Sequence, residues 1–139
     1  MLKKVKGRSV ATFPIAHLRL IADLLYFDGP LLAYLKDEAE QEYLYYWCDT
    51  DEQQNRWLLL PVTKPALQKF LTQQLSLHSL ILAAPPQATY LVDINQALQP
   101  QSVLRVNVAD LPADYLPEPE TYYDASLSVF HDEEAAREL

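Results

Sequence analysis

The sequence predicts an α+β fold, in which an antiparallel sheet of about four to five strands packs on one or two helices. Three observations support this prediction. The chain has 139 residues, 50% of them hydrophobic, which suits one domain with a core of its own. Three strand-like segments follow one another with short polar connections, as in an antiparallel meander. Apolar residues at helical spacing come directly after them.

The N-terminal part predicts a short helix followed by a turn. The apolar residues of segment 9–23 lie close to helical spacing, and Pro14 is tolerated in a first helical turn. Asp28-Gly29-Pro30 then predicts a turn, because glycine adopts backbone angles that other residues avoid. The first predicted strand begins directly after this turn.

The meander is the clearest element of the sequence. Its three predicted strands are Leu31–Lys36, Tyr43–Cys48 and Trp57–Val62. Aromatic and β-branched residues favour strands, and the middle segment is rich in tyrosine. Because side chains alternate along a strand, Tyr43, Tyr45 and Trp47 are expected on one face and Leu44, Tyr46 and Cys48 on the other.

Two helices and two further strands are expected after the meander. Thr63 and Ser76 are suitable N-cap residues for helices through Leu75 and Ile81. The Pro85-Pro86 pair ends the second helix. Segments Thr89–Ile94 and Val103–Val108 then read as a fourth and a fifth strand, the last with clean alternation of apolar and polar residues.

Charge divides the chain into three parts of one predicted domain, residues 1–139. Residues 1–8 form a basic, flexible start with Lys3, Lys4, Lys6 and Arg8. Residues 110–139 hold nine acids and one arginine, which accounts for the whole net charge of -8. Prolines and tyrosines in this last part predict an extended segment anchored on the surface by its aromatic rings. Asp132 is expected to cap a short terminal helix.

Several kinds of site are excluded by what the sequence lacks. Two glycines that lie far apart cannot form a phosphate-binding loop, and one cysteine cannot form a disulfide framework or a multi-cysteine zinc site. His17, His78 and His131 are widely separated, so we expect structural or solvated histidines and neither a metal site nor a cofactor. Cys48 is expected to be a small apolar residue, because the acids that follow it disfavour a reactive thiolate.

An interaction surface is the most specific site that the residues predict. Tyrosine and tryptophan are enriched at protein interfaces, because they bury a large area at low entropic cost. Two alternatives remain for the aromatic face of the meander: a partner covers it, or the C-terminal segment folds back over it. The predicted surface consists of Tyr43, Tyr45, Trp47, Trp57, Tyr115, Tyr122 and Tyr123.

Six segments in this order resemble a known family. They are Leu24–Leu32, Tyr43–Asp49, Arg56–Leu58, Leu75–Ile81, Tyr90–Asp93 and Leu111–Pro117. Together they are similar to an uncharacterised family of small bacterial proteins, the domain of unknown function numbered 6575. The resemblance covers residues 24–123 and implies a stand-alone cytosolic bacterial domain without a known catalytic activity. It implies no catalytic residue.

We therefore expect a non-enzymatic module for protein–protein interaction in the cytoplasm. Its most concrete form is an acidic neutraliser of a basic partner, comparable to an antitoxin or immunity protein, and a homodimer is a further expectation. The alternative is a small hydrolase or nucleotide-handling enzyme in which Asp28, Asp49 and Asp93 converge. Four terminal cations without interleaved aromatic residues make nucleic acid an unlikely partner. The uncharged stretch from Phe70 to Val92 does not suggest a membrane span, because polar residues and the Pro85-Pro86 pair interrupt it.

Overall fold

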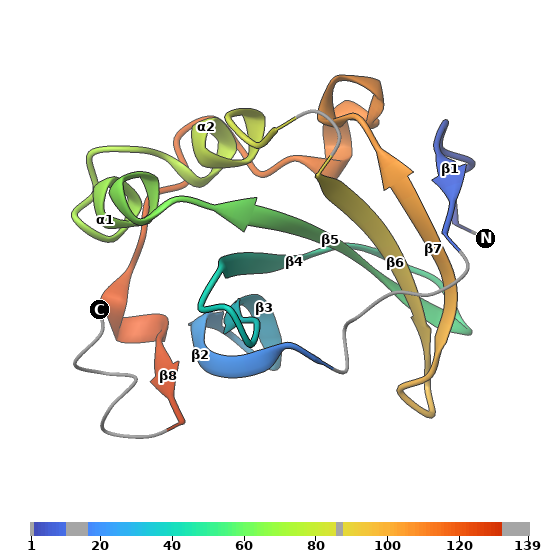
Figure 1. Ribbon diagram of the computed structural model, residues 1–139, viewed down its shortest axis with the longest axis horizontal. Coiled ribbons are helices and arrows are strands. Elements are labelled where there is room, and N and C mark those ends of the chain that lie inside the picture. The colour runs from blue at the N-terminus through green and yellow to red at the C-terminus, as the bar shows by residue number, and fades with distance from the viewer. Residues whose placement is uncertain (1, 11–16, 86–87, 132–139) are drawn as a thin grey trace.

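The computed structural model describes residues 2–10, 17–85 and 88–131 and shows one antiparallel sheet of eight strands (Figure 1). The strand order is β1-β7-β6-β5-β4-β3-β2-β8, so that six consecutive strands form a meander and the two terminal strands close its edges. The strands are β1 (Arg8–Ser9), β2 (Arg19–Tyr26), β3 (Pro30–Lys36), β4 (Glu42–Thr50), β5 (Gln54–Val62), β6 (Thr89–Asn95), β7 (Pro100–Val106) and β8 (Val129–Phe130).

The predicted α+β class is therefore wrong, because the fold is mostly sheet. Two short helices, α1 (Lys64–Leu71) and α2 (Leu77–Leu82), accompany the eight strands of the described chain. The largest error is the helix expected within residues 9–23. Residues 19–26 form strand β2, and residues 11–16 lie outside the described part. Strand β2 pairs with β3 through three register shifts, so its apolar residues do not alternate as those of a regular strand do.

The strands and helices predicted between residues 31 and 106 are found, although some of their bounds differ. The three predicted strands of the meander correspond to β3, β4 and β5, and the fourth and fifth to β6 and β7. Both predicted helix caps are formed, because the hydroxyl of Thr63 accepts a hydrogen bond from Ala66 N and that of Ser76 from Ser79 N. Such caps satisfy backbone donors that the first helical turn leaves unpaired.

The core lies on one side of the sheet, which we call the helix face. Leu44, Leu58 and Leu60 point from the central strands to this side and are almost fully buried. Phe70 of α1 and Ile81 of α2 pack on them from above. On the opposite side, the aromatic face, Tyr45 lies opposite Leu59 and Trp47 opposite Trp57.

A C-terminal strap, residues 107–128, completes the cover of the helix face. It leads from the end of β7 to β8 at the far edge of the sheet and contains three short 3-10 turns, Val108–Asp110, Ala113–Tyr115 and Ala125–Leu127. Leu77 N donates to Thr121 O (2.8 Å), and the side-chain amide of Gln73 donates to Tyr123 O (2.8 Å). The strap is therefore held by both α2 and the α1–α2 connection (Figure 1).

The position of the strap bears on two predictions for the C-terminal segment: that it folds back over the aromatic face, and that its aromatic rings anchor it on the surface. The strap covers the helix face, so it does not fold back over the aromatic face. Its aromatic anchors are part of the core, since Tyr115 is 1% exposed and Tyr123 7% exposed. The helix expected from Asp132 lies outside the described residues. Among the helices of the described chain, none combines the length and the apolar character needed to cross a membrane.

Candidate functional site

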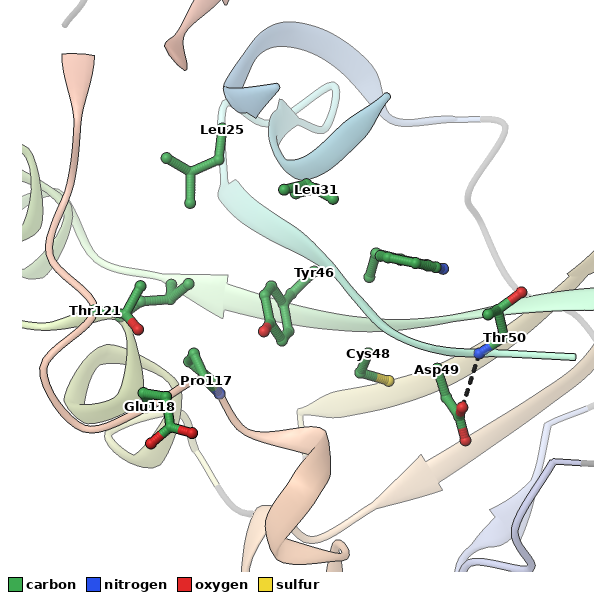
Figure 2. A pocket seen from close by; sticks show the side chains of 11 residues that line it. Leu25, Leu31, Tyr46, Cys48, Asp49, Thr50, Pro117, Glu118 and Thr121 are labelled. Carbon is green, nitrogen blue, oxygen red and sulfur yellow. Dashed lines mark hydrogen bonds between the residues drawn. The ribbon is translucent and has the colours of Figure 1, made fainter. Parts of the chain in front are cut away.

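A groove opens on the helix face between the strap and the sheet. Its volume is about 530 Å³. The β2–β3 hairpin and β4 form one side, and Leu77 of α2 forms the other together with Pro117, Glu118 and Thr121 of the strap (Figure 2). Seven mainly apolar residues line it: Leu25, Leu31, Tyr46, Trp47, Cys48, Leu77 and Pro117.

The charges at this groove, which we call the strap groove, are all of one sign. Asp49 and Glu118 are the charged residues among those described in its lining, and Thr50 and Thr121 add polar groups. Figure 2 shows Glu118 and Thr121 on the strap, across the groove from Asp49 and Thr50 on β4. An apolar interior with a few polar groups at the rim is the usual composition of a binding site.

A register shift in β4 brings Asp49 to this side of the sheet. Trp47 pairs with Trp57, but the next residue that pairs with β5 is Asp49, opposite Arg56. Cys48 is thus the extra residue of a β-bulge, which reverses the alternation of side chains beyond it. Regular alternation would place Asp49 on the aromatic face, whereas the bulge directs it to the helix face.

Behind Asp49, a buried ion pair connects three parts of the chain. The Arg56 guanidinium donates to both carboxylate oxygens of Asp93, at 2.7 and 2.9 Å. It also donates to Tyr115 Oη (2.9 Å) and to the carbonyl of Lys3 (2.6 Å). Tyr115 Oη in turn donates to Asp49 Oδ2 (2.7 Å). Arg56 thereby joins the sheet to both the N-terminal segment and the strap.

Burial changes the acidity of two groups at the groove. Desolvation raises the pKa of Tyr115 to about 12, and the Asp49 carboxylate acts in the same direction against the opposing Arg56. Desolvation also raises the pKa of the Cys48 thiol to about 12, although Arg56 partly offsets it. Both groups are protonated at neutral pH. Neither is therefore suited to act as a nucleophile there.

The three aspartates of the enzyme alternative are placed in different surroundings. Asp28 lies in the turn between β2 and β3, with a positive φ of 55°. Asp49 and Asp93 flank Arg56 on neighbouring strands. The oxygens of Asp93 accept both hydrogen bonds from Arg56, and Asp49 accepts from Tyr115, so both carboxylates serve the buried network. The absence of enzymatic activity stays a prediction.

The seven residues of the predicted interaction surface lie on two sides of the sheet. Tyr43, Tyr45, Trp47 and Trp57 are half-buried on or beside the aromatic face, where the Tyr45 ring stacks on Trp57 at 4.5 Å. Tyr115 and Tyr123 belong to the core on the helix face, and Tyr122 beside them is 49% exposed. Four of the seven therefore lie close together, and one of these four, Trp47, also lines the strap groove. The role of the predicted surface in binding stays a prediction.

The histidines do not converge on a common centre. His131 Nε2 lies 2.9 Å from Asp23 Oδ2, whereas His17 approaches Glu38 at 3.9 Å. His78 lies on α2. Within the ranges that the structure describes, no group of three or more histidine, cysteine or acidic residues is arranged to hold a metal ion.

Sequence reasoning missed the strap side of the groove and the network behind it. Pro117, Glu118 and Thr121 were part of an acidic segment without a recognisable motif. Arg56 directly precedes the predicted strand Trp57–Val62 and belongs to no motif. One signal was present: Asp93 lies inside the predicted strand Thr89–Ile94, and a charged residue in an otherwise apolar strand is rarely buried without a partner.

The comparisons with known proteins give one match. No curated protein and no solved structure matches the chain. The family model of the family of unknown function DUF6575 matches residues 12–136. This match is wider than the six segments that suggested the resemblance, and it confirms them. The chain therefore belongs to this family of unknown function.

Proposed function

We propose that the protein is a non-enzymatic interaction module whose strap groove binds an extended, basic segment of a partner protein. The observation behind this proposal is the composition of the groove. Its interior accepts apolar side chains, and Asp49 and Glu118 are the charged residues of its described lining. A lysine or arginine of the partner at the rim meets carboxylates on both sides.

The shape of the neighbouring strand supports an extended occupant. Pairing between β3 and β4 ends at Leu32 opposite Tyr46, whereas β4 continues to Thr50. In the described chain, Trp47, Asp49 and Thr50 therefore pair with β5 alone, with Cys48 as the bulged residue between them, and leave one strand edge beside the groove. Such an edge binds an extended peptide through main-chain hydrogen bonds, and the adjoining groove selects its side chains.

More specifically, we propose that binding of the acidic chain blocks the activity of a basic partner protein, as an antitoxin or immunity protein does. The net charge of -8 favours fast, salt-sensitive association with a basic protein. A second copy of the chain is a less suitable occupant, because its net charge is equally negative. Light scattering of the full chain tests this point, and a dimer that Glu118→Lys dissociates would make the second copy the occupant.

Peptide selection on the immobilised full-length chain tests the proposal directly. We expect a random peptide library to yield sequences that combine apolar residues with lysine or arginine. A selected peptide should bind Glu118→Lys at least about tenfold more weakly, because the substitution reverses a charge at the groove. Glu120→Lys is the matched control, since Glu120 is exposed on the same segment but does not line the groove.

The comparison of the two variants decides the outcome. Equal losses for Glu118→Lys and Glu120→Lys would show a general effect of net charge and contradict the proposed groove. Selected peptides without basic residues would contradict the proposed partner chemistry. Both variants change exposed residues, so circular dichroism should show an unchanged fold.

A further inference from the structure

A second charged surface lies at the opposite edge of the sheet. Strand β1 pairs with β7 so that Arg8 stands directly opposite Arg105, and both residues are exposed. Like charges in directly opposed positions of neighbouring strands destabilise a sheet. A bound anion between or beside the two guanidinium groups removes this repulsion.

The N-terminal lysines add to this surface. In the segment before β1, the side chain of Val5 packs towards the core, and a Cβ on Gly7 would lie 2.9 Å from the side chain of the buried Val106. Arg8 lies beside Arg105 through the pairing of β1 with β7, and Lys4 and Lys6 are exposed in the segment that leads to Arg8.

Arg105 links these cations to an aromatic groove. Its Nη2 donates to Tyr90 Oη (2.8 Å), and its guanidinium carbon lies 5.4 Å from the centre of the Tyr90 ring. A groove of about 500 Å³ is lined by Arg105, Tyr90, Tyr43, Gln41 and Thr63 together with four apolar residues. Among the described residues of this lining, none is acidic.

We propose that this basic edge and the aromatic groove beside it bind single-stranded nucleic acid. Surfaces that bind single strands combine cations along the phosphate backbone with aromatic side chains on which bases stack. Arg8, Lys6 and Arg105 supply the cations, and Tyr90 and Tyr43 supply the aromatic surface.

The sequence could not show this arrangement. The four cations of residues 1–8 lacked interleaved aromatic residues, which disfavoured a nucleic-acid contact. The pairing of β1 with β7 brings a further arginine and a tyrosine, 97 and 82 positions after Arg8 in the chain, to the same edge. The proposal concerns a different surface from the strap groove, so either can fail without the other.

A single strand fits this edge better than a duplex does. In the described chain the edge offers the two-residue strand β1, strand β7 and a groove, with no helix that could enter a major groove. The net charge of -8 also opposes a large contact with a duplex. Binding of a short single strand needs only a few phosphates at the cations, and its unstacked bases are free to reach the tyrosines.

Fluorescence anisotropy with a labelled oligothymidylate of roughly 12 nucleotides tests the proposal at low salt. We expect binding that weakens as salt is added, because cations of the protein replace counterions of the phosphates. Arg8→Gln and Arg105→Gln should each reduce the affinity at least about fivefold and lower the salt slope by about 0.7. Tyr90→Leu should reduce the affinity about fivefold or more through lost stacking.

Lys69→Gln is the matched control, because Lys69 is an exposed cation on α1, which covers the other side of the sheet. No binding of the oligonucleotide by the full chain at low salt would overturn the proposal. Equal losses for Lys69→Gln and Arg105→Gln would overturn it too. Polyglutamate that competes as well as the oligonucleotide, with Tyr90→Leu unchanged, would show a surface for acidic proteins and overturn it as well.

Discussion

At the scale of single residues, Arg56 connects the sheet to the strap and to the N-terminal segment. Its guanidinium donates hydrogen bonds to a carboxylate on β6, to a hydroxyl on the strap and to a carbonyl of the N-terminal segment. A buried guanidinium is tolerated only when its donors are satisfied. Because its partners come from distant parts of the chain, the network fixes the groove wall at Asp49 together with the strap.

Removing the Tyr115 hydroxyl tests this network. Tyr115→Phe leaves Asp49 and one Arg56 donor without their common partner, so the free energy of unfolding should fall by about 1–3 kcal/mol. Urea denaturation followed by circular dichroism measures it. Tyr122→Phe is the control, because Tyr122 is 49% exposed and its change should stay below about 0.5 kcal/mol. Equal effects of the two substitutions would contradict the structural role of the network.

The thiol of Cys48 gives a second test at this scale. Its pKa is raised to about 12 from a usual value of 9.0, so the reactive thiolate is scarce near pH 8. Alkylation by iodoacetamide should therefore be at least about 100-fold slower in the folded protein than in urea. The rate should continue to rise with pH beyond pH 9, as thiolate forms. Equal rates in the folded and unfolded chain would show that the thiol is neither buried nor perturbed.

At the scale of elements, strand β1 depends on a glycine. An added Cβ at Gly7 would lie 2.9 Å from the carbonyl oxygen of Arg105, which as a backbone atom on β7 cannot easily move. Gly7 thus permits the close approach of the N-terminal segment to the sheet edge. Val10 N, which donates to Val103 O (2.9 Å), reports on this approach.

Gly7→Ala should therefore weaken the pairing of β1 with β7. Hydrogen exchange at the Val10 amide should become at least about tenfold faster, while the amides of the central strands keep their protection. Ser9→Ala is the control, since Ser9 is an exposed neighbour in the same strand. Unchanged exchange at Val10 in Gly7→Ala would contradict the pairing of β1 with β7.

Elements with a strong local signal could be predicted from the sequence, and elements defined by their neighbours could not. The tyrosine-rich strand β4 and the caps Thr63 and Ser76 carry their own signals. Strand β2 has bulges that imitate helical spacing, and β1 and β8 are two-residue strands that exist only through pairing with β7 and β2. The position of Asp49 depends on the bulge at Cys48, which no local pattern announces.

At the scale of the whole molecule, the two sides of the sheet carry surfaces of different charge. The strap and the helices cover one side and leave a groove with an acidic rim. The other side carries stacked aromatic rings and, at its β1–β7 edge, a row of cations. A chain with a net charge of -8 thus presents both signs of charge in separate places.

The most direct measurement is a map of amide chemical shifts on the full-length chain while a selected basic peptide is added. We expect shifts at Leu31, Cys48 and Thr121, which line the strap groove, and none at Trp57 on the aromatic face. Shifts confined to Trp57 and its neighbours, with the groove unchanged, would contradict the proposed docking site and make the aromatic face the binding surface.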